Sequence, residues 1–182
     1  SEVERLIEEL DELNRRINEK HKKLRRELEE LNKRVAERHE ELIRRLRKLL
    51  EDLERLARRG NRSSKLLEDI KRLVDEVRER NRESLDELRR LTRTVAERNK
   101  RSLEEARELT ERVRKKAEDV PLSEELRKRV EDALRRSKEN IKRLEEESRE
   151  VLRRSEKSID ELRRESERVL KEVKEEIERV RK

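Results

Sequence analysis

The sequence has no cysteine, no aromatic residue, one glycine and one proline. Without cysteine there is no disulfide and no thiolate metal site, and the sequence indicates neither an oxidising nor a reducing compartment. No apolar run approaches 18 residues and no signal-peptide pattern is present, so we expect neither a membrane span nor export. The remaining expectation is a soluble protein, cytoplasmic when it is expressed recombinantly.

The composition that these absences leave is dominated by charge. Charged residues make up 58% of the chain and hydrophobic residues 29%, which is typical of long-helix and coiled-coil proteins and argues strongly against strands. High charge with few large hydrophobes is also typical of disorder, but disordered chains do not place their leucines periodically. Whether the chain is folded or disordered therefore depends on whether its leucines recur with a regular helical period.

Only two stretches interrupt the helical pattern, one around Gly60 and one around Pro121. Gly60 suits the left-handed position after a helix end, and Ser63 or Ser64 suits the cap of the next helix. Pro121 cannot continue a helix, and Ser123 before two glutamates reads as a new N-terminus. At the start, Ser1 and Glu4 form a capping box. The prediction is three helices, at about 2–59, 64–118 and 123–181, in one domain of residues 1–182.

The apolar residues of the first helix form one stripe with an 18-residue repeat. Its spacings cycle through three, four, four, three and four, so five turns take 18 residues, which is the period of a straight helix. The stripe consists of Leu6, Leu10, Leu13, Ile17, His21, Leu24, Leu28, Leu31, Val35, His39, Leu42, Leu46, Leu49 and Leu53. The other two helices repeat units of their own with the same period. The expected fold is an all-α, single-chain, up-down-up three-helix bundle of long, nearly straight helices.

The hydrophobic residues are roughly as many as three such stripes require, so few are left for a second apolar face. This balance favours one core shared by three helices of one chain, and it argues against an obligate oligomer. We therefore expect a monomer that requires no partner.

Polar, uncharged residues interrupt each stripe. A buried polar group without a partner costs about 1 to 3 kcal/mol, so these residues should meet one another as a structural polar network. The candidates are Asn14, His21, Asn32, His39, Asn81, Ser84, Thr92, Asn99, Ser102, Thr110, Ser137, Asn140, Ser148, Ser155 and Ser158, and Ser166 lies on the third stripe as well.

The positions of the two breaks allow an estimate of which residues lie level. Turning points at about residue 61 or 62 and near residue 120 or 121 place residue i of the first helix beside about 123 minus i of the second and i plus about 118 of the third. His21 is then level with Asn99, Ser102, Ser137 and Asn140, and His39 with Asn81, Ser84, Ser155 and Ser158. Asn32 is level with Thr92 and Ser148, and Asn14 with Thr110 but with no polar partner on the third helix. Layers of this kind would penalise slips of register.

The repeated polar layers, the saturation of the surface with Glu, Lys and Arg, the short capped loops and the absence of aromatics resemble computationally designed helical bundles with buried hydrogen-bond networks. The stretch "RRSKENIKRLEEESREVLRRSEKSIDELRRESERVLKEV" is similar in texture to the outer helices of designed cage-and-latch switches and designed heterodimers. The resemblance implies a designed scaffold with no natural biochemical function. The resemblance assigns no functional role to any individual residue of this sequence.

The histidines are the residues that invite a sharper interpretation. Residues 18 apart lie about 27 Å apart along a helix, so His21 and His39 cannot share a metal. No carboxylate on the stripe orients either imidazole and no oxyanion hole is evident, so we expect no enzyme, no cofactor and no catalytic residue. A buried neutral histidine predicts partial destabilisation by acid. A deliberate pH switch remains an alternative.

Two interaction hypotheses also remain open. The chain could be an interaction module, a component of a designed heterodimer or switch that offers a groove to a partner helix. Between Arg44 and Lys65 there are nine basic and three acidic residues, and Arg179, Arg181 and Lys182 could lie beside them. This could be a polyanion site, or cations that favour a helix C-terminus. We expect the second, with neither nucleic acid nor membrane as a partner.

Overall fold

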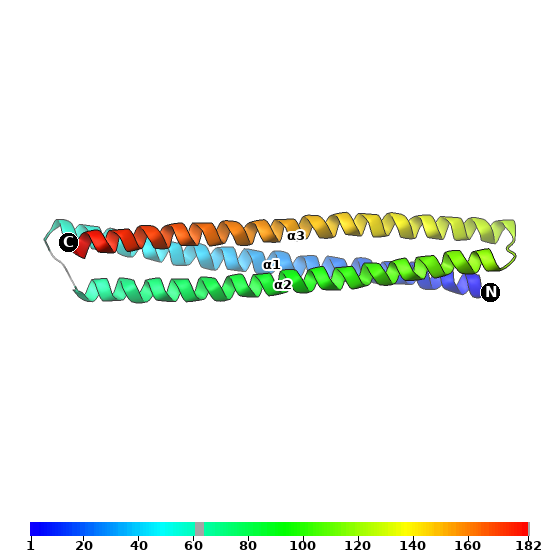
Figure 1. Cartoon of the computed structure of the whole chain (residues 1–182), viewed down its shortest axis with the longest axis horizontal. Helices are drawn as coiled ribbons and strands as arrows, with labels where there is room; N and C mark the ends of the chain where they lie inside the picture. Colours follow the sequence, from blue (N-terminus) through cyan, green and yellow to red (C-terminus); the bar gives the residue numbers. More distant parts are fainter. Residues whose placement is uncertain (61–63, 182) are drawn as a thin grey trace. The chain divides into compact units, whose positions relative to one another are not determined.

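The computed structural model describes residues 1–60 and 64–181, which form three long helices (Figure 1). They are α1 (Glu2–Arg58), α2 (Ser64–Asp119) and α3 (Glu124–Arg181). Each end lies within one residue of its predicted bound, and the described residues contain no strand. The three-helix architecture is confirmed, whereas a single domain of residues 1–182 stays a prediction.

The helix ends follow from the residues that the sequence places there. Gly60 has a φ of 75°, the left-handed conformation expected after a helix end. At the start of α3 the Leu126 amide donates to Ser123 Oγ at 3.2 Å, and at the start of α1 the Glu4 amide donates to Ser1 Oγ at 3.3 Å. Of the two cap candidates for α2, Ser64 is its first helical residue, and Ser63 lies outside the described residues.

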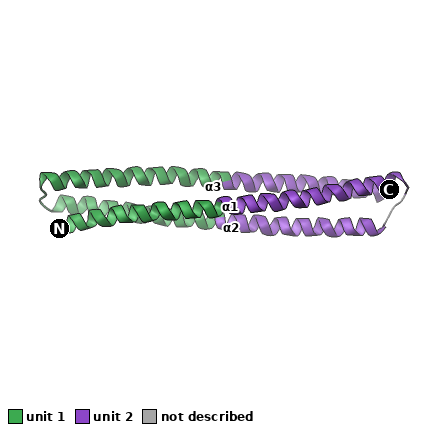
Figure 2. Cartoon of the chain, turned by 180° about the vertical axis from the view of Figure 1, so that it is seen from behind, with its two compact units in different colours: residues 1–28, 92–154 green, residues 29–91, 155–182 purple. Residues whose placement is uncertain are grey.

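The chain divides into two compact units, each built from a part of all three helices (Figure 2). Unit 1 comprises residues 1–28 and 92–154, and unit 2 comprises residues 29–91 and 155–182. Each helix therefore contributes one segment to each unit.

The core of unit 1 contains two apolar clusters. One surrounds Leu10 and Val113, with Val3, Leu6, Ile7, Val130 and Ala133. The other surrounds Ile17 and Leu144, with Leu13, Leu103, Ala106 and Ile141. Val3 and Ile7 are buried although they do not belong to the predicted stripe, so the apolar face of α1 is wider than the stripe near its N-terminus.

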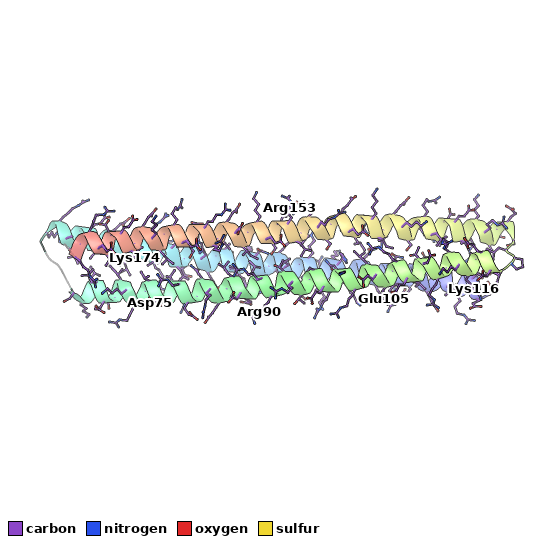
Figure 3. All side chains as sticks on the ribbon, in the orientation of Figure 1. Asp75, Arg90, Glu105, Lys116, Arg153 and Lys174 are labelled. Carbon is purple, nitrogen blue, oxygen red and sulfur yellow. The ribbon has the colours of Figure 1, made fainter. Side chains whose placement is uncertain are left out.

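The core of unit 2 contains a larger apolar cluster. Its members are Leu42, Ile43, Leu46, Leu53, Ile70, Val77, Val169, Val173, Ile177 and Val180. Leu49, predicted to belong to the stripe, packs against this cluster but is only partly buried. No large hydrophobic side chain is exposed in the described ranges, and charged side chains such as Arg90 and Arg153 project outward along the helices (Figure 3).

The direction of the helices follows from polar pairs within each unit. In unit 1, α1 and α3 pair at sequence separations of 123 to 126, which is the constant difference of parallel helices. In the α2–α3 pairs Thr110–Ser137 and Asn99–Ser148 the residue numbers have the same sum, as antiparallel helices require. Unit 2 repeats the α1–α3 separation of 123 and the same α2–α3 sum, in Asn32–Ser155 and Asn81–Ser166.

This register corrects the predicted offset between α1 and α3, which is 123 or more instead of about 118. The prediction assumed that the chain turns back symmetrically near Pro121, whereas the constant sum places the turning point near Ser123 and Glu124. Val120 and Leu122 pack against the apolar cluster at this end of unit 1. The connection thus covers the end of the core, and the first turn of α3 extends past the end of α2.

Candidate functional site

The first polar layer of unit 1 joins all three helices through Ser137 on α3. Asn14 Nδ2 on α1 donates to Ser137 Oγ at 3.0 Å and also to the Leu10 carbonyl, and Asn14 Oδ1 accepts from Asn140 Nδ2 at 2.9 Å. Ser137 Oγ lies 2.7 Å from Thr110 Oγ1 on α2, which also donates to the Ala106 carbonyl. We call Asn14, Thr110, Ser137 and Asn140 the Asn14 layer. Each of its side chains has a partner on another helix.

A charged rim extends this layer to the surface of unit 1. Arg143 donates to Asn140 Oδ1 at 2.7 Å, to Asn18 Oδ1 at 3.2 Å and to Glu147 Oε1 at 3.0 Å. One guanidinium therefore links the layer to an amide of α1 and to a carboxylate of α3, a use of its fixed donors that lysine could not reproduce.

The second polar layer of unit 1 contains His21. Asn99 Nδ2 on α2 donates to Ser148 Oγ on α3 at 2.9 Å. His21 is 7% exposed and Asn99 is 5% exposed, yet neither His21 Nε2 nor Asn99 Oδ1 has a hydrogen-bond partner. We call these three residues the His21 layer, and it is incompletely paired.

The matching layer of unit 2 contains His39, and it is better connected. His39 Nδ1 lies 3.4 Å from Asn81 Oδ1 on α2, and Asn81 Nδ2 donates to Ser166 Oγ on α3. An amide oxygen such as Asn81 Oδ1 can only accept a hydrogen bond. The imidazole of His39 therefore carries a proton on Nδ1 and donates it to this oxygen. The other ring nitrogen, Nε2, has no hydrogen-bond partner and lies 3.6 Å from Glu165 Oε2. We call His39, Asn81 and Ser166 the His39 layer.

The 18-residue repeat relates the layers of the two units residue by residue. His21, Asn99 and Ser148 correspond to His39, Asn81 and Ser166, and Asn14 and Ser137 correspond to Asn32 and Ser155. Asn32 Nδ2 donates to Ser155 Oγ at 3.3 Å, as Asn14 does to Ser137, at the same separation of 123. The repeat is thus a repeat of hydrogen-bonded pairs.

Several predicted pairings are wrong because the α3 offset was wrong. Ser137 and Asn140 bond to Asn14 instead of His21, so Asn14 does have polar partners on α3. Ser155 bonds to Asn32 instead of His39.

Two further pairings change with the same offset. Ser148 bonds to Asn99 instead of Asn32, and Ser166, which the predicted network omitted, completes the His39 layer. The predicted match of His39 with Asn81 agrees with their contact.

Other predicted members lie at the edge of the layers. Ser84, Ser102 and Ser158 are half-buried, and no hydrogen bond joins them to another layer residue in the described part of the chain. Thr92 is buried in unit 1. The rim residues Asn18, Arg143, Glu147 and Glu165 were not predicted, although the repeat itself aligns Glu147 with Glu165.

Burial lowers the pKa of His21 below its ordinary value, with the Glu147 carboxylate opposing the shift and the Arg143 guanidinium adding to it. The neutral imidazole is therefore the form that the folded unit 1 prefers near neutral pH.

The layers offer little for metal or acid–base chemistry. No three His, Cys, Asp or Glu side chains converge as metal ligands within residues 1–60 and 64–181. Glu165, which does not belong to the predicted stripe, lies 3.6 Å from His39 Nε2 at the rim of its layer. No described helix has a stretch long and apolar enough to cross a membrane.

The basic residues of the predicted polyanion site are partly paired. Arg55 pairs with Asp52 at 2.8 Å and Arg179 with Glu176 at 3.2 Å, while Lys182 lies outside the described residues. These contacts are between neighbours on one helix. The interpretation of the basic residues as cations that favour a helix C-terminus stays a prediction.

No family model and no curated protein matches the chain. Among solved structures, the chain is similar to one described as a computationally designed three helix bundle, with a TM-score of 0.70 and 19% sequence identity. The similarity covers 99% of this chain and 90% of that chain. The comparison shows that the chain has the fold of a three-helix bundle.

Proposed function

We propose that the chain is a computationally designed, monomeric scaffold without catalytic activity, and that its polar layers specify how the three helices pair. The observation that carries the proposal is the repetition of one pairing in both units. Asn14–Ser137 and Asn32–Ser155 have the same donor, the same acceptor and the same separation of 123. The similarity in fold to a designed bundle supports the proposed origin.

Hydrogen bonds inside a core favour one arrangement over others more than they add net stability. A buried bond contributes about 1 kcal/mol, whereas a buried donor or acceptor left without a partner costs about 1 to 3 kcal/mol. A shift by one or more turns would separate Asn14 from Ser137 and Asn99 from Ser148 together. A leucine-only core carries no such penalty, since one leucine packs against another in many registers.

The same penalty acts against association with other chains. A helix of a different protein that replaced α3 in unit 1 would have to offer polar groups at the levels of Ser137, Asn140 and Ser148. The layers thus favour the chain's own helices over a partner that lacks them.

The mass in solution tests this proposal. We expect light scattering to give 22.5 kDa for the chain, the mass of one copy. A variant that replaces the amide and imidazole side chains of the layers (Asn14→Leu, His21→Leu, Asn32→Leu, His39→Leu, Asn81→Leu, Asn99→Leu), called the six-leucine variant, should form larger species as well, because fewer buried hydrogen bonds then penalise shifted pairings, including those between copies.

The result that would contradict the proposal is a stable multiple of 22.5 kDa for the unchanged chain. That outcome would favour the interaction module, in which a partner helix completes the bundle. Six exposed Glu→Gln changes on the outer faces serve as the control and should leave the mass unchanged. Leucine at such positions, as in Glu8→Leu, would not serve, since it would create a new apolar face.

A further inference from the structure

The two histidine layers differ in the charges at their rims, although the repeat aligns them. In unit 2 the residue that faces the imidazole is Glu165, 3.6 Å from His39 Nε2 and 46% exposed. In unit 1 the corresponding residue is Glu147, whose carboxylate accepts from Arg143 at 3.0 Å. The position that corresponds to Arg143 in unit 2 is Glu161, so Glu165 has no arginine one turn before it.

The hydrogen bonds of His39 leave room for a second ring proton. Because Nδ1–H donates to Asn81 Oδ1, the neutral ring directs the lone pair of Nε2 toward a carboxylate oxygen, and two acceptors then face each other. A proton on Nε2 turns this contact into a charge-assisted hydrogen bond. Protonated His39 therefore keeps both N–H groups partnered while Asn81 and Ser166 stay in place.

Other charged groups near His39 are balanced. The groove between α1 and α2 in unit 2 has three arginines and three glutamates along its walls, and α2 contributes the neutral Asn81 to the ring. Arg38 and Glu87 of this groove pair with each other at 3.9 Å. The groove residues are Arg38, Glu41, Arg45, Arg80, Glu83 and Glu87. Glu165 is thus the carboxylate that contacts the ring.

The surroundings of His21 do not offer the same arrangement. Its charged neighbours on α3 are Glu147 and Arg143, which neutralise each other, and α2 contributes the neutral Asn99. A second ring proton would turn His21 into an imidazolium cation near the Arg143 guanidinium, and the two positive charges would repel each other. The His21 layer also already contains buried polar atoms without hydrogen-bond partners. Protonation of His21 is opposed by its surroundings.

We propose that acid acts selectively on unit 1: His39 accepts a proton inside its layer with Glu165 as the counter-charge, whereas protonation of His21 opens the layer that contains it. This inference deepens the structural role proposed for the layers and rests on it. The chain thereby contains one acid-tolerant and one acid-sensitive copy of the same layer.

The sign of the pH effect follows from linkage. A histidine that stays neutral in the folded state but ionises in the unfolded state stabilises fully above its unfolded pKa of about 6.5, and this contribution is lost as the pH falls below that value. Between pH 7.5 and 5.5, one such histidine raises the unfolding equilibrium constant about tenfold.

Urea unfolding of the full chain at pH 7.5 and 5.5 tests the inference. His21→Leu should remove about tenfold from the acid-induced rise in the unfolding constant, and His39→Leu should leave that rise unchanged. Both variants restore the leucine that the stripe itself would place there, so both should fold. Equal effects of the two substitutions would overturn the inference.

A pair of rim variants provides a matched test, since the two residues are related by the repeat. Glu165→Gln should add about a further tenfold rise on acidification, because protonated His39 then lacks its counter-charge. Glu147→Gln should add none. An equal response of both variants would contradict the inference, and since the mass and register of the chain are measured separately, its failure is distinguishable from failure of the scaffold proposal.

Discussion

Replacement of Asn81 by alanine is expected to lower the free energy of unfolding by about 2 to 5 kcal/mol, because this side chain connects the other two members of its layer. Its Oδ1 faces His39 Nδ1 at 3.4 Å and its Nδ2 donates to Ser166 Oγ. Alanine would leave a buried imidazole N–H and a buried hydroxyl without partners, and would leave a cavity beside them. Guanidinium unfolding followed by circular dichroism at pH 7.5 measures the loss.

The repeat supplies a matched control in unit 1. Asn99 occupies the corresponding position, but only its Nδ2 is bonded, to Ser148 at 2.9 Å, and its Oδ1 has no partner. Asn99→Ala should therefore cost about 1 to 3 kcal/mol, less than Asn81→Ala. An Asn99→Ala loss equal to or larger than that of Asn81→Ala would show that the connectivity of the layer does not set its energy.

Replacement of Leu46 by alanine should cost about 2 to 5 kcal/mol, the range for truncation of a fully buried leucine. Leu46 is completely buried within the largest apolar cluster of unit 2. Alanine removes three buried carbon atoms and leaves a cavity that long, regular helices cannot easily close. The same guanidinium measurement applies.

Leu50 is the appropriate comparison for Leu46. It packs against the same cluster from the same helix but remains partly exposed. Because less of its side chain leaves water on folding, Leu50→Ala should cost less than half as much. Equal losses would mean that the cluster is not the centre of the core of unit 2.

The helices themselves could be predicted from sequence because local chemistry determines their ends. Gly60 adopts a positive φ that other residues avoid, and Ser123 Oγ accepts a bond from the first turn of α3. The apolar period determined which face is buried, with Leu10, Leu28 and Leu46 as examples. Such signals lie within a few residues of the feature that they specify.

The offset between α1 and α3 could not be predicted in the same way. It depends on how far the chain continues past Asp119 before it turns, and hence on the packing of Val120 and Leu122 against the end of the core. A constraint was nevertheless present in the sequence. An offset of 123 places Asn14 and Asn32 directly opposite Ser137 and Ser155, whereas an offset of 118 places them directly opposite Asp132 and Glu150.

The rim around the histidines escaped prediction for a different reason. Glu165 and Arg143 are charged residues on a surface that consists almost entirely of charged residues, so their types carry no signal. Only the structure shows that Arg143 bonds to Glu147 while Glu165 faces His39. The contrast within the repeat, arginine at 143 and glutamate at 161, acquires meaning only from these contacts.

The central claim is that the polar layers set the register of the helices, and a spin-label distance tests it most directly. The chain has no cysteine, so labels can be attached at introduced cysteines without a background. Asp11→Cys with Arg136→Cys labels a pair whose original side chains lie 3.2 Å apart in unit 1. Asp11→Cys with Arg129→Cys labels the register that an offset of 118 would produce.

For the unchanged layers we predict one short distance for the 11/136 pair and one longer distance for the 11/129 pair, because residues 129 and 136 lie about 10 Å apart along α3. In the six-leucine variant both pairs should show a mixture of distances, since the inserted leucines pack in several registers and the amide and imidazole pairings are gone. A single, unchanged distance for each pair in that variant would contradict the claim, because the register would then be set without the polar layers.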